Sequence, residues 1–269
     1  MNKYFILILA SCLLLSCNND EKNPETQTIN IPEPTDIPAI EYSVVSSFPH
    51  DTTSYTQGLL IHDKKVFEST GSPSNLKQTK SVFGILDMTT GKINVKAELD
   101  KDTYFGEGIC ILKNKLYQLT WLNQTGFIYD AKTFKKIGDF KFTNKEGWGL
   151  TTDGTNLIMS DGTDKLSYID PLTLKIVKTI TTSYNNLNEL EFIRGYIYAN
   201  IYQKNFIVKI DPSNGNVTGI LDLSSLVYKA QLKSKKAEVL NGIAFDSISN
   251  KILVTGKLWP VVYQINFAN

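Results

Sequence analysis

The chain has 269 residues, a formal net charge of +1, 42% hydrophobic residues and 20% charged residues. This composition is ordinary for a globular protein with a sizeable core, and the near-neutral charge excludes nucleic-acid binding through a basic surface. Only two His and three Cys are present, at scattered positions: His50, His62, Cys12, Cys17 and Cys110. We therefore expect no metal site, no cofactor and no disulfide framework.

Residues 1–16 have the pattern of a secretory signal. Lys3 gives a short positive start, and residues 4–15 form an apolar run that is too short to span a membrane. The segment ends in Leu-Leu-Ser before Cys17, which resembles a bacterial lipobox, where the signal is removed and the Cys is acylated. This predicts a lipoprotein held in the bacterial cell envelope by a membrane anchor on Cys17. The alternative is a plain signal peptide, with Cys17 an ordinary thiol.

Residues 17–39 are polar and contain four Pro. Such a composition predicts a disordered tether between the anchor and the folded domain. Cys12 would be removed with the signal, so Cys110 has no partner other than Cys17. We expect Cys110 to be a buried, inert thiol.

A repeated unit fills residues 40–269. Five segments open with a Gly-apolar or similar pair, and each is followed by a short turn and a second apolar segment. The third residues of the openings are Leu59, Ile109, Leu150, Leu190 and Ile243, and the second segments centre on Val66, Leu116, Leu157, Ile197 and Ile252. A third segment with an acidic turn and then a fourth segment follow in the first four units. Val, Ile and aromatic residues between Gly, Asp and Asn turns indicate strands throughout.

Four strands in each unit of about 40–50 residues are typical of a propeller blade. We therefore predict an all-β, five-bladed β-propeller over residues 40–269. The last unit ends in its third strand, residues 261–265, and residues 41–45 supply the missing fourth strand, which closes the ring. A β-sandwich is the alternative, but it gives no reason for repeats that match in register. The segment 223–238 between the last two blades predicts one short helix.

Two sets of repeat positions predict where a site lies. The first set is the residue two before the third residue of each opening, and the second set is the residue five after the central residue of each second segment. Both sets fall at one mouth of the channel, because the strands of a hairpin run antiparallel. The first set is Gln57, Glu107, Trp148, Asn188 and Asn241, and the second is Gly71, Trp121, Gly162, Tyr202 and Lys257. This variety favours one asymmetric pocket with aromatic walls and convergent polar groups. The alternative is that Glu107 and Lys257 form an ion pair that plugs the channel.

Such a pocket supports a limited chemistry. No His is well placed for a Ser-His-Asp triad, and glycoside hydrolysis would need a second carboxylate, for which only Glu189 offers itself beside Glu107. One carboxylate with one Lys and neutral amides suits proton transfer at an uncharged amide substrate.

Several strings, in the right order, resemble the plant and bacterial type of glutaminyl-peptide cyclotransferase over about residues 44–267. They include Tyr55-Thr56-Gln57-Gly58-Leu59, Phe105-Gly106-Glu107-Gly108, Glu146-Gly147-Trp148-Gly149-Leu150, Leu187-Asn188-Glu189-Leu190-Glu191 and Thr255-Gly256-Lys257-Leu258-Trp259-Pro260. The resemblance implies a metal-free propeller enzyme that converts an N-terminal glutaminyl residue of a peptide or protein to a pyroglutamyl residue and releases ammonia. We also expect a monomer. A non-catalytic surface lipoprotein that binds a peptide or glycan at the channel mouth is the alternative.

The resemblance also implies roles for particular residues. Glu107 corresponds to the active-site acid, and Asn188 and Lys257 correspond to the amide and ammonium groups. The substrate-binding residues correspond to Tyr55, Gln57, Phe105, Trp121, Trp148 and Tyr202. Tyr202 stands where the family usually has Trp; it keeps a flat face and adds a hydroxyl, so an altered substrate preference is expected.

Overall fold

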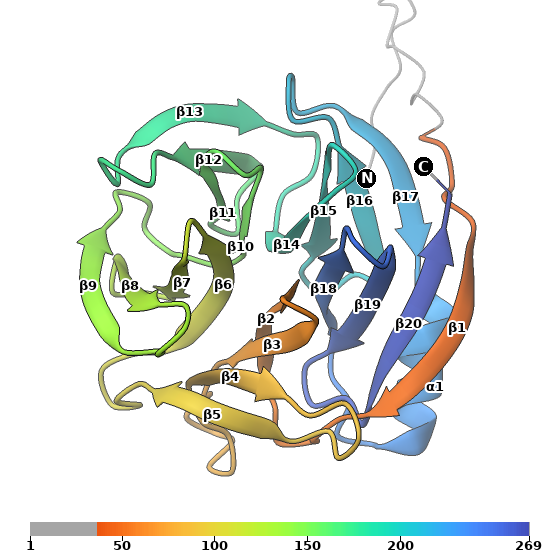
Figure 1. The fold of residues 1–269 in the computed structure, drawn as a ribbon. Coiled ribbons are helices and arrows are strands. Elements are labelled where there is room, and N and C mark those ends of the chain that lie inside the picture. Colours follow the sequence, from red (N-terminus) through yellow and green to blue (C-terminus); the bar gives the residue numbers. More distant parts are fainter. Residues whose placement is uncertain (1–36, 269) are drawn as a thin grey trace, which may run out of the picture. The chain divides into compact units, whose positions relative to one another are not determined.

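The structure is a computed structural model that describes residues 37–268. Over this range the chain forms five four-stranded antiparallel sheets around a common axis, and one helix joins the last two (Figure 1). In the first four sheets the strand nearest the axis comes first in the chain and the next strands follow outward, whereas in the fifth sheet the outermost strand is β1 (Tyr42–Pro49), the first strand of the chain. The predicted all-β, five-bladed propeller is therefore confirmed.

The blades are numbered in chain order. Blade 1 holds β2 (Thr56–His62), β3 (Lys65–Thr70), β4 (Val82–Leu86) and β5 (Ile93–Glu98), and blade 2 holds β6 (Gly106–Leu112), β7 (Lys115–Thr120), β8 (Thr125–Asp130) and β9 (Lys136–Lys141). Blade 3 holds β10 (Leu150–Thr152), β11 (Leu157–Ser160), β12 (Lys165–Ile169) and β13 (Ile176–Thr181), and blade 4 holds β14 (Leu187–Ile193), β15 (Tyr196–Ile201), β16 (Phe206–Ile210) and β17 (Val217–Asp222). Blade 5 holds β18 (Leu240–Asp246), β19 (Lys251–Gly256), β20 (Val261–Phe267) and β1 (Tyr42–Pro49).

The ring is closed by its N-terminal strand. β1 pairs antiparallel with β20, from Tyr42 opposite Phe267 to Pro49 opposite Val261. The predicted closing strand is confirmed and runs four residues further than the expected end at residue 45. The predicted helix is also present as α1 (Ser224–Lys233), which buries Leu226, Val227 and Ala230. No helix in residues 37–268 is long and apolar enough to cross a membrane.

The apolar core lies between the blades. Buried side chains form five clusters, and each cluster joins two neighbouring blades; the one between blades 4 and 5 also takes in the buried side of α1. Alternate residues of the inner strands therefore pack on opposite neighbours, as a pleated sheet buried on both faces requires, whereas the outermost strand of each blade is more exposed. This packing makes the inner strands a rigid frame for side chains at the channel mouth.

The innermost strands share an irregularity at the same place. The pairing between the first and second strands shifts between Thr56 and Gly58, and at the equivalent positions of blades 2, 4 and 5: Gly106 to Ile109, Leu187 to Leu190 and Leu240 to Ile243. A bulge inserts an unpaired residue and re-aims its side chain. Gln57, Glu107, Asn188 and Asn241 all lie within these bulges. In blade 3, Trp148 comes just before the short strand β10.

The recurring Gly of the repeat lets neighbouring innermost strands approach each other. A Cβ on Gly108 would lie 2.5 Å from the backbone nitrogen of Leu150, and one on Gly149 would lie 2.0 Å from the carbonyl oxygen of Asn188. The Gly108 amide also donates to the carbonyl of Trp148 at 2.7 Å. Any side chain at Gly108 or Gly149 would force the blades apart at the channel.

The described structure begins at residue 37, three residues before the predicted domain boundary at residue 40. The Ile220 amide donates to the carbonyl of Pro38, and the Ile40 amide donates to the carbonyl of Ile220, so residues 38–40 run along β17. Residues 37–39 of the predicted tether thus belong to the described structure. The predicted signal at 1–16, Cys17 and the rest of the tether lie outside it.

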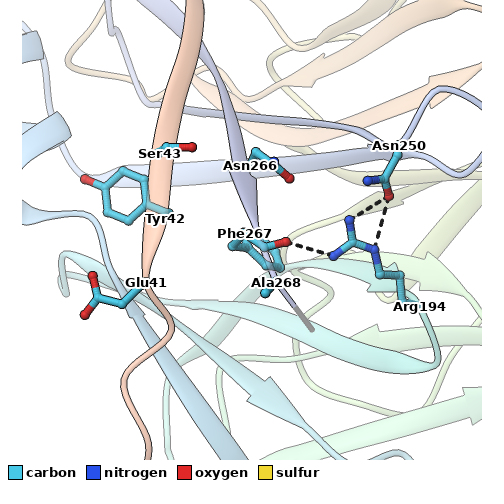
Figure 2. A pocket seen from close by; sticks show the side chains of 8 residues that line it. All are labelled: Glu41, Tyr42, Ser43, Arg194, Asn250, Asn266, Phe267 and Ala268. Carbon is cyan, nitrogen blue, oxygen red and sulfur yellow. Dashed lines mark hydrogen bonds between the residues drawn. The ribbon is translucent and has the colours of Figure 1, made fainter.

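The single Arg of the chain joins blades 4 and 5. Arg194, in the turn after β14, donates from Nη2 to Asn250 Oδ1 at 2.6 Å and from Nη1 to the Phe267 carbonyl at 3.1 Å (Figure 2). These residues line a hollow at the end of β20, where Glu41, Tyr42 and Ser43 also lie. The guanidinium is engaged in holding the two blades, so we assign it no role in binding.

Candidate active site

One pocket at the channel mouth contains every predicted catalytic and substrate-binding residue. Its volume is about 620 Å³, within the usual range for small-molecule sites. The predicted residues that line it are Tyr55, Gln57, Phe105, Glu107, Trp121, Trp148, Asn188, Tyr202 and Lys257. The rim is built by loops of blades 1 and 2, residues 72–75, 101–104 and 121–123. Seven of the ten register positions line this pocket, Tyr55 and Phe105 were expected from the resemblance alone, and the rim loops were not expected.

The polar centre is a chain of three side chains. Gln57 Nε2 donates to Glu107 Oε1 at 3.1 Å, and Lys257 Nζ donates to Gln57 Oε1 at 2.7 Å. Asn241 lies behind Gln57 and donates to the same oxygen at 3.3 Å. In the described part of the chain, Glu107 and Lys257 make no direct ion pair. The plugged-channel alternative, in its direct form, is therefore wrong: an amide separates the two charges.

Burial brings Glu107 and Lys257 toward their neutral forms. Their exposed fractions are 4% and 3%. Burial raises the pKa of Glu107 well above its ordinary value, and the charge of Lys257 offsets this only in part. Burial lowers the pKa of Lys257 to about 8, against the opposing charges of Glu107 and Glu238. A carboxyl with a raised pKa beside an amine with a lowered pKa is suited to accept and return a proton.

Aromatic rings form two walls of the pocket. The ring centroid of Phe105 lies 5.7 Å from that of Trp121 and 6.3 Å from that of Tyr55, and Trp148 meets Tyr202 edge to face at 5.6 Å. The ammonium of Lys257 lies 4.6 Å from the ring centre of Tyr55, close enough for a cation–π contact. These walls exclude water from the polar centre.

Two Gly residues of the predicted rings make room for these walls. A Cβ on Gly71 would lie 2.1 Å from the Phe105 ring, and one on Gly162 would lie 2.7 Å from the Trp148 ring. The ring beside Gly71 comes from the segment before β6 of the next blade, and the ring beside Gly162 comes from the segment before β10 of its own blade. The missing side chains of Gly71 and Gly162 leave the space that the Phe105 and Trp148 rings occupy. The residue type alone did not show that these rings lie there.

Glu146 is a site residue that the sequence reasoning missed. Its Oε2 accepts from the indole nitrogen of Trp121 at 2.5 Å and from that of Trp148 at 2.7 Å. It also contributes to the raised pKa of Glu107. Its place two residues before Trp148 was visible in the sequence, but nothing there showed that one carboxylate holds two indoles.

Asn188 lines the pocket with an amide that has spare hydrogen-bonding capacity. Its Oδ1 is buried and receives no hydrogen bond from the residues that the structure describes. Buried polar atoms are rarely left in this state, and those at functional sites are available to a ligand. The pocket therefore offers the amide of Asn188 to a ligand in addition to the carboxyl–amide–ammonium chain.

Two other predicted residues lie away from the pocket. Glu189 does not face Glu107: it accepts from the amide of Leu59 at 3.1 Å and from that of Ile243 at 2.7 Å, which joins blade 4 to blades 1 and 5. The suggestion of Glu189 as a second pocket carboxylate is therefore wrong. Cys110 is a buried free thiol, and burial raises its pKa well above the ordinary value, which keeps it in the unreactive thiol form.

The fold and pocket together define a class of protein: a five-bladed β-propeller with a buried carboxyl–amide–ammonium chain in an aromatic pocket at its channel mouth. Residues 8–267 match the family model described as glutamine cyclotransferase, and the chain belongs to that family. It is 43% identical over 233 residues to a glutaminyl-peptide cyclotransferase of Arabidopsis thaliana, a match that covers 84% of this chain and 71% of the relative. The crystal structure of Myxococcus xanthus glutaminyl cyclase superposes with a TM-score of 0.77 at 30% identity, covering 84% of this chain and 96% of that one.

Proposed function

We propose that this protein is a glutaminyl-peptide cyclotransferase, which converts the N-terminal glutaminyl residue of a peptide to a pyroglutamyl residue and releases ammonia. The observation that carries the proposal is the buried chain Glu107–Gln57–Lys257 within aromatic walls, in a member of the glutamine cyclotransferase family. The reaction needs one group that moves a proton between two nitrogens and donors that stabilise an oxyanion. The pocket holds both.

The steps follow from the side chains present. The substrate's α-amine attacks its own side-chain amide carbon, and a new C–N bond forms while the carbonyl oxygen gains negative charge. Glu107 takes the proton from the attacking amine and passes it to the amide nitrogen, the C–N bond to that nitrogen breaks, and ammonia leaves. Lys257 Nζ and the amide nitrogen Nδ2 of Asn188 donate hydrogen bonds to the oxyanion, and Asn188 Oδ1 is left to accept from the substrate. A single carboxyl is enough because it accepts and then returns the same proton.

The aromatic walls contribute mainly by orientation. The flexible glutaminyl side chain must fold back on its own amine, and flat rings on two sides restrict it to that conformation. Tyr55, Phe105, Trp121, Trp148 and Tyr202 supply these rings. The rim over blades 1 and 2 leaves an exit for the rest of the peptide. Among the described residues, no three His, Cys, Asp or Glu side chains lie close enough together to hold a metal ion. The proposed steps involve no metal ion.

The direct test is ammonia release from a dipeptide that begins with Gln, with the same dipeptide beginning with Asn as the matched control. The Asn side chain is one methylene shorter and would have to close a strained four-membered ring. We expect ammonia from the Gln peptide alone, and the same rate after treatment with EDTA. No release above the uncatalysed rate would instead favour a binding protein, and a loss in EDTA that zinc restores would contradict the metal-free mechanism.

We also propose that the mature chain is a monomeric lipoprotein of the bacterial cell envelope, anchored through Cys17. The support is the apolar run followed by Leu-Leu-Ser before this Cys. Cells that express the chain should incorporate labelled fatty acid into it, and a Cys17→Ser variant should not. Cys110→Ser is the matched control, because its buried thiol is no acceptor. Labelling that survives Cys17→Ser would contradict the anchor.

A further inference from the structure

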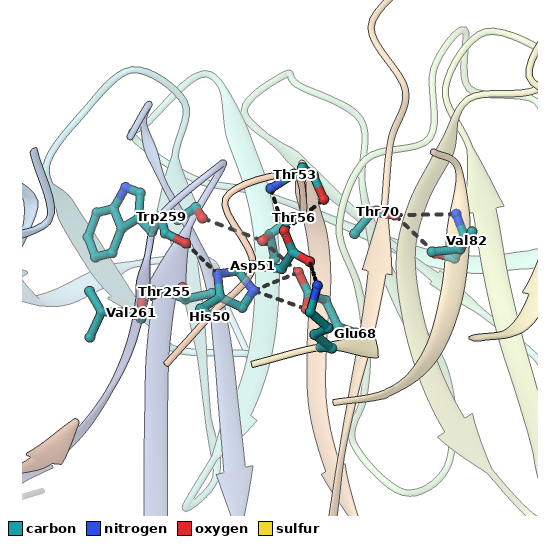
Figure 3. A network of polar contacts seen from close by, with 12 residues as sticks. His50, Asp51, Thr53, Thr56, Glu68, Thr70, Val82, Thr255, Trp259 and Val261 are labelled. Carbon is teal, nitrogen blue, oxygen red and sulfur yellow. Dashed lines mark hydrogen bonds and ion pairs between the residues drawn. The ribbon is translucent and has the colours of Figure 1, made fainter. Parts of the chain in front are cut away.

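A buried His and a buried Glu meet at the seam where the ring closes. His50 follows β1, Glu68 lies in β3, and both side chains are completely inaccessible to solvent. His50 Nδ1 lies 2.8 Å from the carbonyl oxygen of Trp259, and His50 Nε2 lies 3.1 Å from each carboxylate oxygen of Glu68 (Figure 3). The proposed reaction uses neither residue.

The partners of the ring indicate that His50 is an imidazolium. A carbonyl oxygen only accepts, so Nδ1 carries a proton, and Nε2 faces a carboxylate; both nitrogens donate only in the charged ring. Burial alone lowers the pKa of His50. The charge and hydrogen bond of Glu68, the carbonyl of Trp259 and the charge of Asp51 together raise it by more than burial lowers it, so the pKa lies above its ordinary value. Asp51 itself pairs with Lys92 at 3.5 Å.

The turn that carries Lys257 rests on the segment around His50. The His50 amide donates to the carbonyl of Pro260 at 3.1 Å, and the Leu258 amide donates to the carbonyl of Ser54 at 2.8 Å. Leu258 holds a φ of +59°, a conformation that an L-residue adopts only when its surroundings fix it. Residues 256–260 therefore take their shape from contacts with residues 50–54.

Glu68 reaches the other wall of the same site. Besides His50, it accepts from Thr56 Oγ1 at 2.8 Å, and Thr56 stands between the pocket residues Tyr55 and Gln57. One carboxylate thus fixes the strand that carries Gln57 and, through His50, the turn that carries Lys257. The 2.7 Å contact between Lys257 and Gln57 spans these two pieces of chain.

We propose that His50, fixed by an ion pair with the buried Glu68, anchors residues 256–260 against residues 50–57 through its Nδ1 contact with the Trp259 carbonyl, and so sets the position of the Lys257 ammonium in the pocket. His50 is then a positioning residue, since it touches no reacting atom. This inference rests on the proposed function. A displacement of about 1 Å in a catalytic group costs about 100-fold in rate, so a loosened turn lowers turnover even in a folded protein.

Two substitutions of His50 separate positioning from stability. In His50→Asn the amide nitrogen takes the place of Nδ1 and still donates to the Trp259 carbonyl. In His50→Gln it takes the place of Nε2, so the Trp259 carbonyl loses its side-chain donor and the turn keeps only its backbone hydrogen bonds. Both lose the ion pair, so both should melt at a lower temperature. His62→Asn is the matched control, because His62 is the only other His and lies on the surface beside Asp63.

The measurements are kcat for a Gln-initiated dipeptide, corrected for folded protein, and melting temperature. We expect kcat to fall about 10- to 100-fold in His50→Gln, to stay within about threefold of wild type in His50→Asn, and to be unchanged in His62→Asn. Equal kcat values in all three would show a purely structural pair and overturn the proposal. A wild-type chain with no turnover would refute the proposed function instead.

A second measurement needs no folded His50 variant. Nitrogen NMR of the wild-type imidazole rings at pH 7 should show one ring with both nitrogens protonated, and His62→Asn should leave that signal in place. The signal should persist above pH 7, since the His50 pKa is raised. A remaining ring that is neutral at pH 7 would overturn the ion pair, whether or not the enzyme turns over.

Discussion

At the scale of single residues, the pocket separates two opposite charges with a neutral amide. Glu107 and Lys257 each bond to Gln57 rather than to each other, so neither is locked into a charged pair. A direct buried ion pair would hold the proton on the Lys and leave the carboxylate a weak base. With Gln57 between them, Glu107 keeps a raised pKa and its second oxygen remains available to a substrate.

Glu107→Gln tests the proton transfer. The amide keeps the size of the side chain and its bond to Gln57 but cannot accept a proton. We expect turnover to fall by about 10²–10⁴-fold, the usual worth of a general acid–base, while the protein stays folded. Ammonia release and melting temperature measured on the same preparation check this. A well-folded variant with near-normal ammonia release would remove Glu107 from the mechanism.

Lys257→Met tests the oxyanion donor. Met keeps the unbranched stem and loses the ammonium, which should lower kcat by about 10²–10³-fold. The pKa of Lys257 is about 8, so the donor is fully charged below this pH and is lost as the pH rises through it. Wild-type kcat should therefore decline on the alkaline side, and the residual activity of Lys257→Met should lack this decline. An identical alkaline limb in both proteins would assign it to another group.

At this scale the sequence predicted which residues gather but not how they bond. Equivalent positions of successive repeats lie at the same height in the ring, so their spacing in the sequence predicted that Gln57, Glu107 and Lys257 lie at one mouth of the channel. The orientation of the Gln57 amide depends on both neighbours at once, and the contact of Glu146 with two indoles depends on loop shape. His50 lies outside the repeat altogether, so no register position pointed to it.

At the scale of elements, the site is built from bulges in the innermost strands. In blades 1, 2, 4 and 5 the first strand carries one extra, unpaired residue near its start. In blade 3 the equivalent residue, Trp148, lies in the segment just before β10. Alternation along a strand predicts which face a side chain takes, but a bulge reverses that alternation locally. The strand pattern therefore predicted the blades well, whereas the aim of the four bulged side chains could be predicted only through their equivalence in the repeats.

Removal of β1 should destabilise the whole ring. A fragment that begins at residue 37 keeps β1 and the contacts of Pro38 and Ile40 with β17, and we expect it to fold and remain active. A fragment that begins at residue 50 exposes the full edge of β20 and leaves blade 5 with three strands. Its melting temperature should drop sharply and it should aggregate. A fragment from residue 41 is the control that loses only the contact with β17; equal melting of all three would contradict the closure by β1.

At the scale of the whole molecule, the ring holds carboxyls near its axis in place of apolar packing, with Glu189 buried and Glu191 half-buried. Glu189 and Glu191, both on β14, accept amide protons from strands of other blades, Glu191 from Phe245 at 2.8 Å. Five strands that meet at an axis leave some amides without a ladder partner, and a carboxyl that reaches across satisfies them. The number of blades and the closing strand were predictable from the sequence because they depend on its periodicity. Glu189 stands where the other blades have Gly, so it breaks the period, and the sequence alone suggested a pocket carboxylate instead of this structural role.

These buried carboxyls predict how the stability of the ring depends on pH. Burial raises the pKa of Glu191 to about 8, while the unfolded chain titrates near its ordinary value of about 4.3. Between these values the folded state holds more protons than the unfolded state, so the free energy of unfolding falls as the pH rises. The raised pKa values of Glu107 and Glu189 act in the same direction, and Asp side chains with lowered pKa values, such as Asp211, act only below this range.

Melting temperatures between pH 5 and 8 test this dependence. We expect the wild-type melting temperature to decline steadily over that range and Glu191→Gln to decline less, because the amide has no proton to lose. Glu98→Gln is the matched control: Glu98 is exposed and pairs with Lys80 on the surface, so its removal should leave the slope unchanged. Above pH 8 the lowered pKa of Lys257 works the other way, since its ammonium is lost first from the folded state and stability recovers toward pH 10. A wild-type melting temperature that rises from pH 5 to 8 would show that the axial carboxyls are ionised in the folded ring.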